Sequence, residues 1–142
     1  MYLSGTEDIL QKSVISTVIS AMDAALGGFE QRDVMRYLRS VLSPVDPDTC
    51  DLVENYAITW GIRGSRWLTS WENHPDGLSA QWDDESRALL NRLNQTRELA
   101  VLPLEKLRQG FQNAKNLKEQ VLALYGLLED IELEQRLDSL AQ

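Results

Sequence analysis

The sequence predicts an all-α fold of about six or seven helices around a single core. Apolar residues recur at spacings of three and four along most of the chain, and cap and breaker residues divide these runs. We find no apolar–polar alternation of strand length and no repeat of 20 to 50 residues. A chain of 142 residues can bury roughly 70% of its unfolded surface. We therefore expect residues 1–142 to form a single helical domain.

The first helix is expected to run from Ser4 to Leu26. Ser4 and Glu7 have the spacing of a capping box, which satisfies free N–H groups at a helix start. Gly27 and Gly28 then end the helix. The residues expected to face the core are Ile15, Val18, Ile19, Met22 and Leu26.

The second helix is expected at about residues 31–42. It should bury Val34, Leu38 and Val41, which share one face. Pro44 closes the segment, because the residue before a proline avoids the helical conformation.

A third helix should begin at Asp46 and Pro47, a good N-cap and first-turn pair. Gly61 is its expected C-cap. The side chains expected to point inward are Val53, Tyr56, Ala57 and Trp60.

Residues 61–82 are expected to form an irregular corner, since the cluster ENHPDG cannot continue a helix. As a hypothesis, Glu54 and Asn55 bond backbone groups at this corner. Two glycines there would adopt positive φ, and Trp67 would fill the junction between helices. The structural motif is expected to comprise Glu54, Asn55, Tyr56, Trp60, Gly61, Gly64 and Trp67.

Helices are expected in most of the remaining chain. One starts near Asp83 and is interrupted at Pro103, and a shorter one covers residues 104–114. Asn116 can cap the next helix, and the acidic tail 132–142 adds another amphipathic turn or two. The apolar residues of these helices are Leu89, Leu90, Leu93, Leu99, Leu117, Val121, Leu124, Tyr125 and Leu128.

Composition excludes several classes of protein. A net charge of −8 opposes a protein that coats nucleic acid or anionic membrane as a whole, so DNA contact would require a local basic patch. Cys50 is the only cysteine, which excludes an internal disulfide and a four-cysteine metal site and fits a reducing compartment. No stretch approaches 18 apolar residues and no leader pattern opens the chain. We therefore expect a cytoplasmic protein without a membrane span.

The sequence contains no recognisable catalytic motif. Phosphate-binding loops and the nucleophile pattern G-x-S-x-G are missing. The only histidine, His74, lies in a polar turn with no evident nucleophile as partner. Asp83, Asp84 and Glu85 could suggest a metal site, but acids at a helix start favour the helix dipole. We predict no catalytic, cofactor-binding or metal-ligating residues in this chain, and a small enzyme is the least favoured interpretation.

Arginines provide the one candidate binding surface. Arg32, Arg36 and Arg39 share a helical face, and Arg63 and Arg66 lie in a stretch without acids. The alternative is that each arginine is solvated and paired with one of the 22 acids. The candidate DNA contacts are Arg36, Arg39, Arg63 and Arg66.

The four tryptophans, at positions 60, 67, 71 and 82, raise a similar choice. An exposed indole can stack on a base, but at helical spacing or beside glycine the usual outcome is core packing. We favour packing.

Two segments carry a family resemblance. FEQRDVMRYLRSVL and DLVENYAITWGIRGSRW are similar to the B-subunit family of bacterial ATP-dependent helicase/deoxyribonucleases (AddB or RexB), with its "DVFRYLK" helix and "LENYVLxxGIxGxxW" corner. The similarity extends over essentially the whole chain. Arg39 replaces a frequent lysine, and Val34-Met35 replaces Val-Phe. The matching positions are Asp33, Arg36, Tyr37, Leu38, Arg39, Leu52, Glu54, Asn55, Tyr56, Gly61, Ile62, Gly64 and Trp67.

The resemblance implies a part of a much larger protein. Members of this family process double-strand breaks for recombinational repair together with a helicase-nuclease A subunit, as parts of an ATP-dependent exonuclease/helicase. The family's nuclease residues, iron-sulfur cysteines and nucleotide-binding loop have no match here. The chain would be an excised, non-catalytic internal domain without cofactor. Its partners would be the rest of the parent protein, the A subunit, and DNA in the assembled complex, with no membrane.

The alternative is a free-standing helical adaptor that binds a partner protein. Its binding surface would be the leucine-rich segment 117–128, since an amphipathic helix can present an apolar face to another helix.

Overall fold

The computed structural model describes residues 5–131, with side chains from residue 11 onward. Within these residues there is no strand, so the predicted all-α class is confirmed. The expected cap at Ser4 and the expected helical turns in 132–142 lie outside the described residues. The elements are α1 (Gly5–Leu26), α2 (Gln31–Leu38), α3 (Pro47–Trp60), the 3-10 helix η1 (Gly64–Leu68), α4 (Asp84–Asn113) and α5 (Leu117–Asp130).

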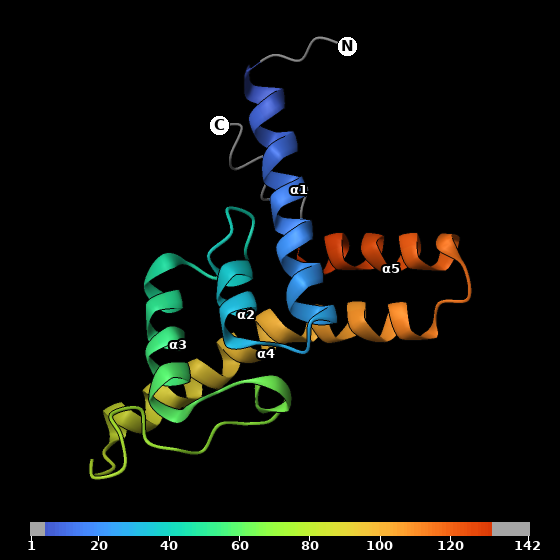
Figure 1. The fold of residues 1–142 in the computed structure, drawn as a ribbon. Helices are drawn as coiled ribbons and strands as arrows, with labels where there is room; N and C mark the ends of the chain where they lie inside the picture. The colour runs from blue at the N-terminus through green and yellow to red at the C-terminus, as the bar shows by residue number, and fades with distance from the viewer. Residues whose placement is uncertain (1–4, 132–142) are drawn as a thin grey trace.

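The long helix α4 organises the fold (Figure 1). Its first part passes beneath α2 and α3, and α1 stands over its middle. After a short connection α5 returns along the last part of α4 as an antiparallel hairpin. The chain from α3 to α4 forms the irregular corner, which packs η1 against α4.

Local cap signals were predicted correctly at two helix starts, Asp46 and Asn116, and at one helix end, Gly61, and the expected start of a helix near Asp83 is also confirmed. Asp46 accepts a hydrogen bond from the Thr49 N–H at the start of α3, and Gly61 ends that helix with φ +61°. Asp83 and Ser86 cap α4 reciprocally. Asn116 accepts from the Glu119 N–H at the start of α5. Each helix-start cap joins residues three positions apart, so the sequence alone carries the signal.

The predicted break at Pro103 was wrong, because α4 continues through it. A proline inside a helix costs about 3 kcal/mol or more. However, Val101, Leu104 and Leu107 are all buried around it. Each such side chain contributes roughly 1.5–3 kcal/mol, so tertiary burial outweighs the backbone cost. The expected count of six or seven helices therefore falls to five α-helices and η1 in residues 5–131.

The predicted core face of α1 was wrong for three of its five residues, whereas Met22 packs against the core as predicted. Ile15 and Ile19 are 50% and 53% exposed, and Leu26 is exposed as well. The buried face consists of small residues, among them Ala21 and Ala24. Because α1 carries apolar residues on opposite sides, periodicity alone could not choose between them. Small side chains let α1 pack closely on α2 and α4.

The second helix is shorter than predicted, because α2 ends at Leu38. Turn hydrogen bonds follow, from the Ser40 N–H to the Tyr37 carbonyl and from the Ser43 N–H to the Ser40 carbonyl. Val41, predicted to be buried, is 65% exposed, and Leu42 is buried in its place.

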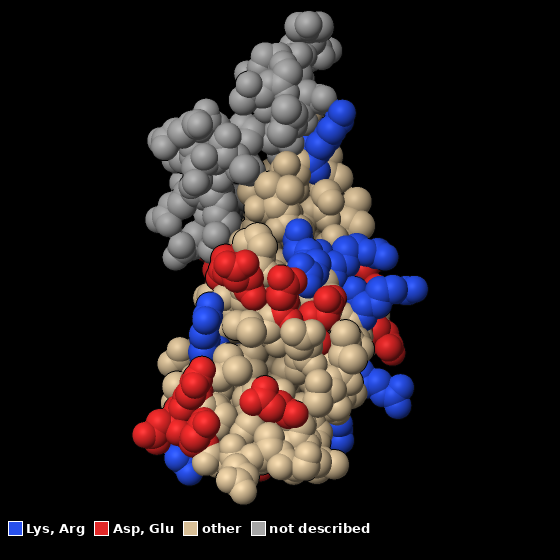
Figure 2. All heavy atoms as spheres, turned by 90° about the vertical axis from the view of Figure 1, so that its left-hand side faces the viewer, with Lys and Arg blue, Asp and Glu red and all other residues tan. Residues whose placement is uncertain are grey.

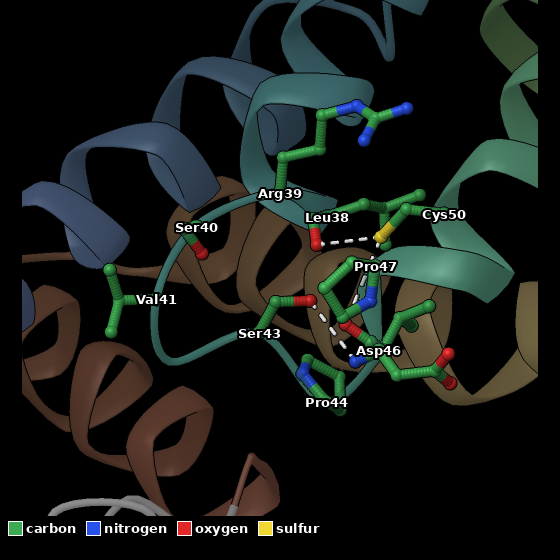
Figure 3. A pocket seen from close by; sticks show the side chains of 10 residues that line it. Leu38, Arg39, Ser40, Val41, Ser43, Pro44, Asp46, Pro47 and Cys50 are labelled. Atoms are coloured by element: carbon green, nitrogen blue, oxygen red, sulfur yellow. Dashed lines mark hydrogen bonds between the residues drawn. The ribbon is translucent and has the colours of Figure 1, made fainter. Parts of the chain in front are cut away.

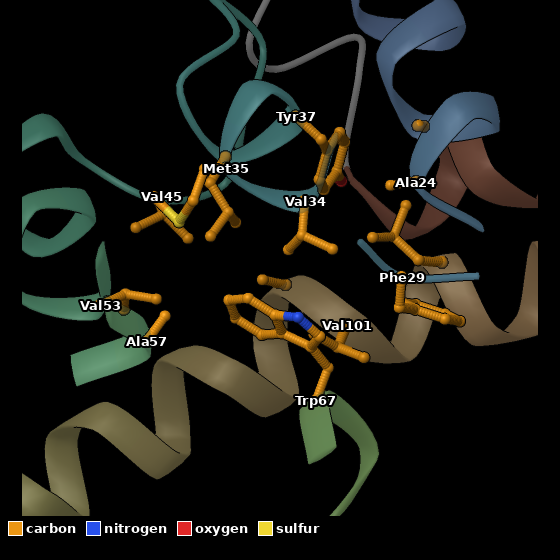
Figure 4. Close-up of a cluster of buried hydrophobic side chains, with 14 of the residues drawn as sticks. Ala24, Phe29, Val34, Met35, Tyr37, Val45, Val53, Ala57, Trp67 and Val101 are labelled. Atoms are coloured by element: carbon orange, nitrogen blue, oxygen red, sulfur yellow. The ribbon is translucent and has the colours of Figure 1, made fainter. Parts of the chain in front are cut away.

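The single core surrounds Trp67 (Figure 4). Its fully buried indole lies among side chains from α2, α3 and α4, including Val34, Ala57 and Val101. Other tryptophans behave differently: Trp71 is buried and Trp60 half-buried, whereas Trp82 is exposed. The prediction that the tryptophans pack in the interior therefore holds for Trp60, Trp67 and Trp71.

Candidate nucleic-acid interface

The corner is held by side chains that bond to its backbone. The Tyr56 hydroxyl donates to the Asn73 carbonyl at 3.0 Å and accepts from the Asn73 N–H at 3.1 Å. Trp60 Nε1 donates to the His74 carbonyl at 2.9 Å. Tyr56 also stacks on Trp71, with ring centroids 4.8 Å apart. Two aromatic residues of α3 therefore fix the path of a loop that has little regular structure.

The hypothesis for Glu54 and Asn55 was wrong, and that for the glycines was correct. Glu54 accepts from Arg39 and not from the corner backbone, and Asn55 is exposed without a side-chain hydrogen bond in the described region. Gly61 and Gly64 both have positive φ, +61° and +60°. The Gly64 N–H donates to the Phe29 carbonyl at 2.9 Å, which ties the corner to the α1–α2 connection.

Sequence reasoning missed two polar residues of α4 that hold the corner. Asn94 accepts from the Trp71 N–H at 2.8 Å and donates to the Trp71 carbonyl at 2.9 Å, as a neighbouring strand would. Arg97 is buried and donates to the Trp67 carbonyl at 3.2 Å. Burial lowers the pKa of the Arg97 guanidinium. Their position on the apolar face of a helix was the available signal.

His74 has a structural role. Its Nδ1 accepts from the Asp76 N–H and its Nε2 lies 2.9 Å from the Gln81 carbonyl oxygen. The ring packs against Trp82, with centroids 4.6 Å apart. Both ring nitrogens are thus used within the loop itself.

A hollow of about 480 Å³ lies beside the α2–α3 connection (Figure 3). Its polar groups bond one another: the buried Cys50 thiol donates to the Leu38 carbonyl at 3.1 Å, and the Val45 N–H donates to Ser43 Oγ. Burial raises the pKa of Cys50. Because these groups already have partners, the hollow is a poor candidate for a ligand site, which needs converging free donors or acceptors.

Three further hollows adjoin one another beside α2, and we call them together the basic groove. They have volumes of about 370, 420 and 540 Å³. Arg36 lines the first and second, and Arg32 lines the second and third. The three hollows thus follow one another from α1, along the exposed face of α2, to the start of the corner, with an arginine shared at each junction. Its cations are Lys12, Arg32, Arg36, Arg39 and Arg63.

Basic side chains gather along one edge of the face seen in Figure 2, with acidic side chains beside them. Arg36 Nη1 lies 3.8 Å from Asp23 Oδ2, and Arg32 Nε lies 3.8 Å from Asp33 Oδ1. Exposed pairs of this kind contribute about 0–1 kcal/mol, so these arginines can exchange partners at little cost. Within the described residues, Arg63 makes no ion pair or side-chain hydrogen bond.

The four candidate DNA contacts differ in their surroundings. Arg36 and Arg39 line the groove, and Arg63 lines its far end. Arg39 is committed to Asp51 at 2.8 Å and Glu54 at 3.1 Å, and its hydrogen bond to Asp51 raises the pKa of Arg39.

Arg66 does not line any of the three hollows, and its guanidinium donates to the Trp60 carbonyl. Lys12 was missed as a groove residue, because it reaches the groove only through the packing of α1 on α2.

The described part of the chain contains neither a metal-binding cluster nor a membrane-spanning helix. No group of three or more histidine, cysteine, aspartate or glutamate side chains could hold a metal ion there. None of the helices within residues 5–131 is long and apolar enough to cross a membrane.

No protein-family model matches the chain. It is, however, similar over nearly its whole length to curated bacterial proteins. The B subunit of the ATP-dependent helicase/deoxyribonuclease from Caldanaerobacter subterraneus is 31% identical over 92% of this chain. Proteins of the same name from Pelotomaculum thermopropionicum and Desulforamulus reducens are 29% and 26% identical over 98% and 100% of it. This chain belongs to the AddB family of ATP-dependent helicase/deoxyribonuclease B subunits.

The match covers one segment of much longer relatives. The chain spans 12% of the Caldanaerobacter and Pelotomaculum proteins and 13% of the Desulforamulus protein. All regular elements in the described residues of this AddB-family segment are helices, and three of these helices contribute residues to the basic groove.

Proposed function

We propose that this chain is a non-catalytic helical domain of the B subunit of a helicase-nuclease that acts in double-strand-break processing and recombinational DNA repair in the bacterial cytoplasm. It serves as a scaffold within the larger protein, which pairs with the A subunit, and it touches a DNA strand through the basic groove. The domain needs no cofactor of its own. Support for the parent activity comes from the names of the relatives.

The row of cations that line the three neighbouring hollows is the observation that carries the DNA contact. Arginines shared between adjoining hollows give a row of cations along α2 despite a net charge of −8. Phosphate contacts from such cations release counterions and therefore favour binding. At this net charge the isolated domain should bind DNA more weakly than the roughly 10⁻⁴ to 10⁻⁶ M of typical non-specific binders. Neighbouring domains would hold the strand close enough for the groove to add its contacts.

The test uses the full-length AddB protein in complex with the A subunit. Arg36 and Arg63 are changed together to Glu, and in a second variant to Gln, which removes charge without adding repulsion. The matched control reverses Arg87 and Lys118, two exposed cations outside the groove. Binding to a DNA duplex with a single-stranded tail is measured at several salt concentrations.

The groove variants should bind more weakly, with a salt slope lower in magnitude by up to about 0.7 to 0.9 per lost contact. The control should lose less, and all complexes should assemble. An unchanged affinity and slope in a correctly assembled complex would rule out a DNA contact by Arg36 and Arg63.

One observation favours the adaptor interpretation. On α5, Leu117, Val121 and Tyr125 recur every four residues and are all exposed, at 73%, 39% and 62%. Such a stripe can dock on a partner helix. An immunoblot of the source cells separates the two interpretations, since a band near the 16.1 kDa of this chain supports a free-standing adaptor. A band several-fold larger supports the domain of a longer protein.

A further inference from the structure

We infer that the basic groove holds the sugar-phosphate backbone of single-stranded DNA and does not read its bases. This inference rests on the proposed DNA contact and specifies which nucleic acid makes it and by which groups.

The walls of the groove favour a single strand over a duplex. Beside the cations, Ile15 and Ile19 from α1 and Ile58 from α3 line the hollows and are at least half exposed. A single strand exposes sugars and base faces that can cover such aliphatic side chains. A duplex hides its base faces and presents charged phosphates on a stiff surface, with a persistence length of about 150 base pairs. Burial of these isoleucines therefore stabilises the single-stranded complex more than a duplex complex.

The size of the groove also suits a strand that lies within it. Its hollows have volumes of about 370 to 540 Å³, in the range of roughly 300 to 1,000 Å³ that holds small organic ligands. A few consecutive nucleotides can occupy the row, each with a phosphate near a cation. Arg32 and Arg36 lie one turn apart on α2, about 6 Å along the helix axis.

Base reading would require groups that the described lining of the groove does not provide. Among the described residues, no aromatic side chain lines the groove, so a base has no ring on which to stack. Gln31 is the one side-chain amide in that described lining, whereas specific recognition uses several converging donors and acceptors. The guanidinium groups are better matched to phosphate, which they can bind in a bidentate manner.

An acidic protein segment is the competing occupant. The groove does contain acids of its own, Glu30 and Glu54, but Glu54 is already bonded to Arg39. Arg32 and Arg36 hold their carboxylate partners at 3.8 Å, and Arg63 is unpaired in the described residues. A row of weakly paired arginines suits the regular charge of a nucleic-acid strand better than an irregular pattern of acidic side chains.

The experiment compares three DNA probes on the assembled full-length complex: a blunt duplex, the same duplex with a natural single-stranded tail, and the duplex with an abasic tail of equal length. The variant changes Arg32, Arg36 and Arg63 to Glu, and the control again reverses Arg87 and Lys118. Binding is measured as a function of salt, and complex assembly by size-exclusion chromatography.

The triple variant should lose roughly 10- to 50-fold in affinity for both tailed probes at about 0.15 M salt, with a slope lower in magnitude by about 2, and lose little on blunt duplex. Loss on the natural tail but not on the abasic tail would overturn the backbone assignment and leave the DNA contact intact. Equal loss on blunt duplex would overturn the single-strand assignment alone. No loss on any probe would overturn the proposed contact itself, and failure of the variant to assemble would identify the groove as a protein interface.

Discussion

Gly110 on α4 faces α5 so closely that a methyl group should separate the two helices. A Cβ at this position would lie 2.7 Å from the Ala123 Cβ, a distance that real Cβ atoms essentially never show. In Gly110→Ala the neighbouring helix must therefore shift. Overpacking of this kind costs about 1–3 kcal/mol, and the better helix propensity of alanine returns about 0.5–1 kcal/mol. We expect a net loss of roughly 0–2.5 kcal/mol in the free energy of unfolding, with a central value of about 1 kcal/mol.

Gly126 on α5 provides the matched control. A Cβ there would meet no other atom within 4 Å. Gly126→Ala should therefore stabilise the chain by about 0.5–1 kcal/mol through propensity alone. The same substitution at two helical glycines is thus expected to have opposite signs.

A double-mutant cycle isolates the steric cause. Ala123→Gly removes the methyl group that Gly110→Ala would meet, so the two changes together should be less harmful than the sum of the single effects. Urea unfolding followed by circular dichroism gives the four free energies. A coupling energy near zero, or equal stabilisation by alanine at both glycines, would refute the close approach of α4 and α5.

Three further outcomes are expected. Trp67→Ala should lower the free energy of unfolding by about 3–5 kcal/mol, because the indole is fully buried. Trp67→Phe should cost less, since the buried Nε1 has no hydrogen-bond partner among the described residues. Equal melting temperatures for the two variants would contradict this expectation. Hydrogen bonds from Ser86 hold the pKa of Asp83 below its ordinary value. The stabilisation by the ionised Asp83 is therefore present above the unfolded pKa of about 3.9 and is lost as pH falls through the folded pKa. Asp83→Asn should weaken the dependence of stability on pH below about pH 4, which acid titration of the melting temperature checks. The isolated chain should neither hydrolyse ATP nor cut DNA with Mg²⁺, and activity that disappears with a point mutation in this chain would overturn the assignment.

The corner illustrates which parts of a site sequence patterns can predict. Gly61 and Gly64 were predictable, because positive φ strongly favours glycine. The role of Trp67 followed from its place beside them. Asn94 and Arg97 were not identified, since their partners lie 23 and 30 residues away along the chain. Their hydrogen bonds exist only once α4 packs against the corner.

The candidate DNA-binding surface was predictable in part for the same reason. The 3.6-residue period placed Arg32, Arg36 and Arg39 on one face, and all three line the groove. Lys12 and Arg63 join them only through packing of α1 and the corner beside α2.

The sequence by itself determined the all-α class, the helix caps at Asp46 and Asn116, and the start of a helix near Asp83. These depend on hydrogen bonds within one turn of the chain, which neighbouring residues fix without help from the rest of the molecule. Tertiary structure alone decided which apolar face of α1 is buried and whether α4 survives Pro103. Those outcomes depend on the area that distant helices bury, and several buried side chains together outweigh the few kcal/mol of a local backbone preference.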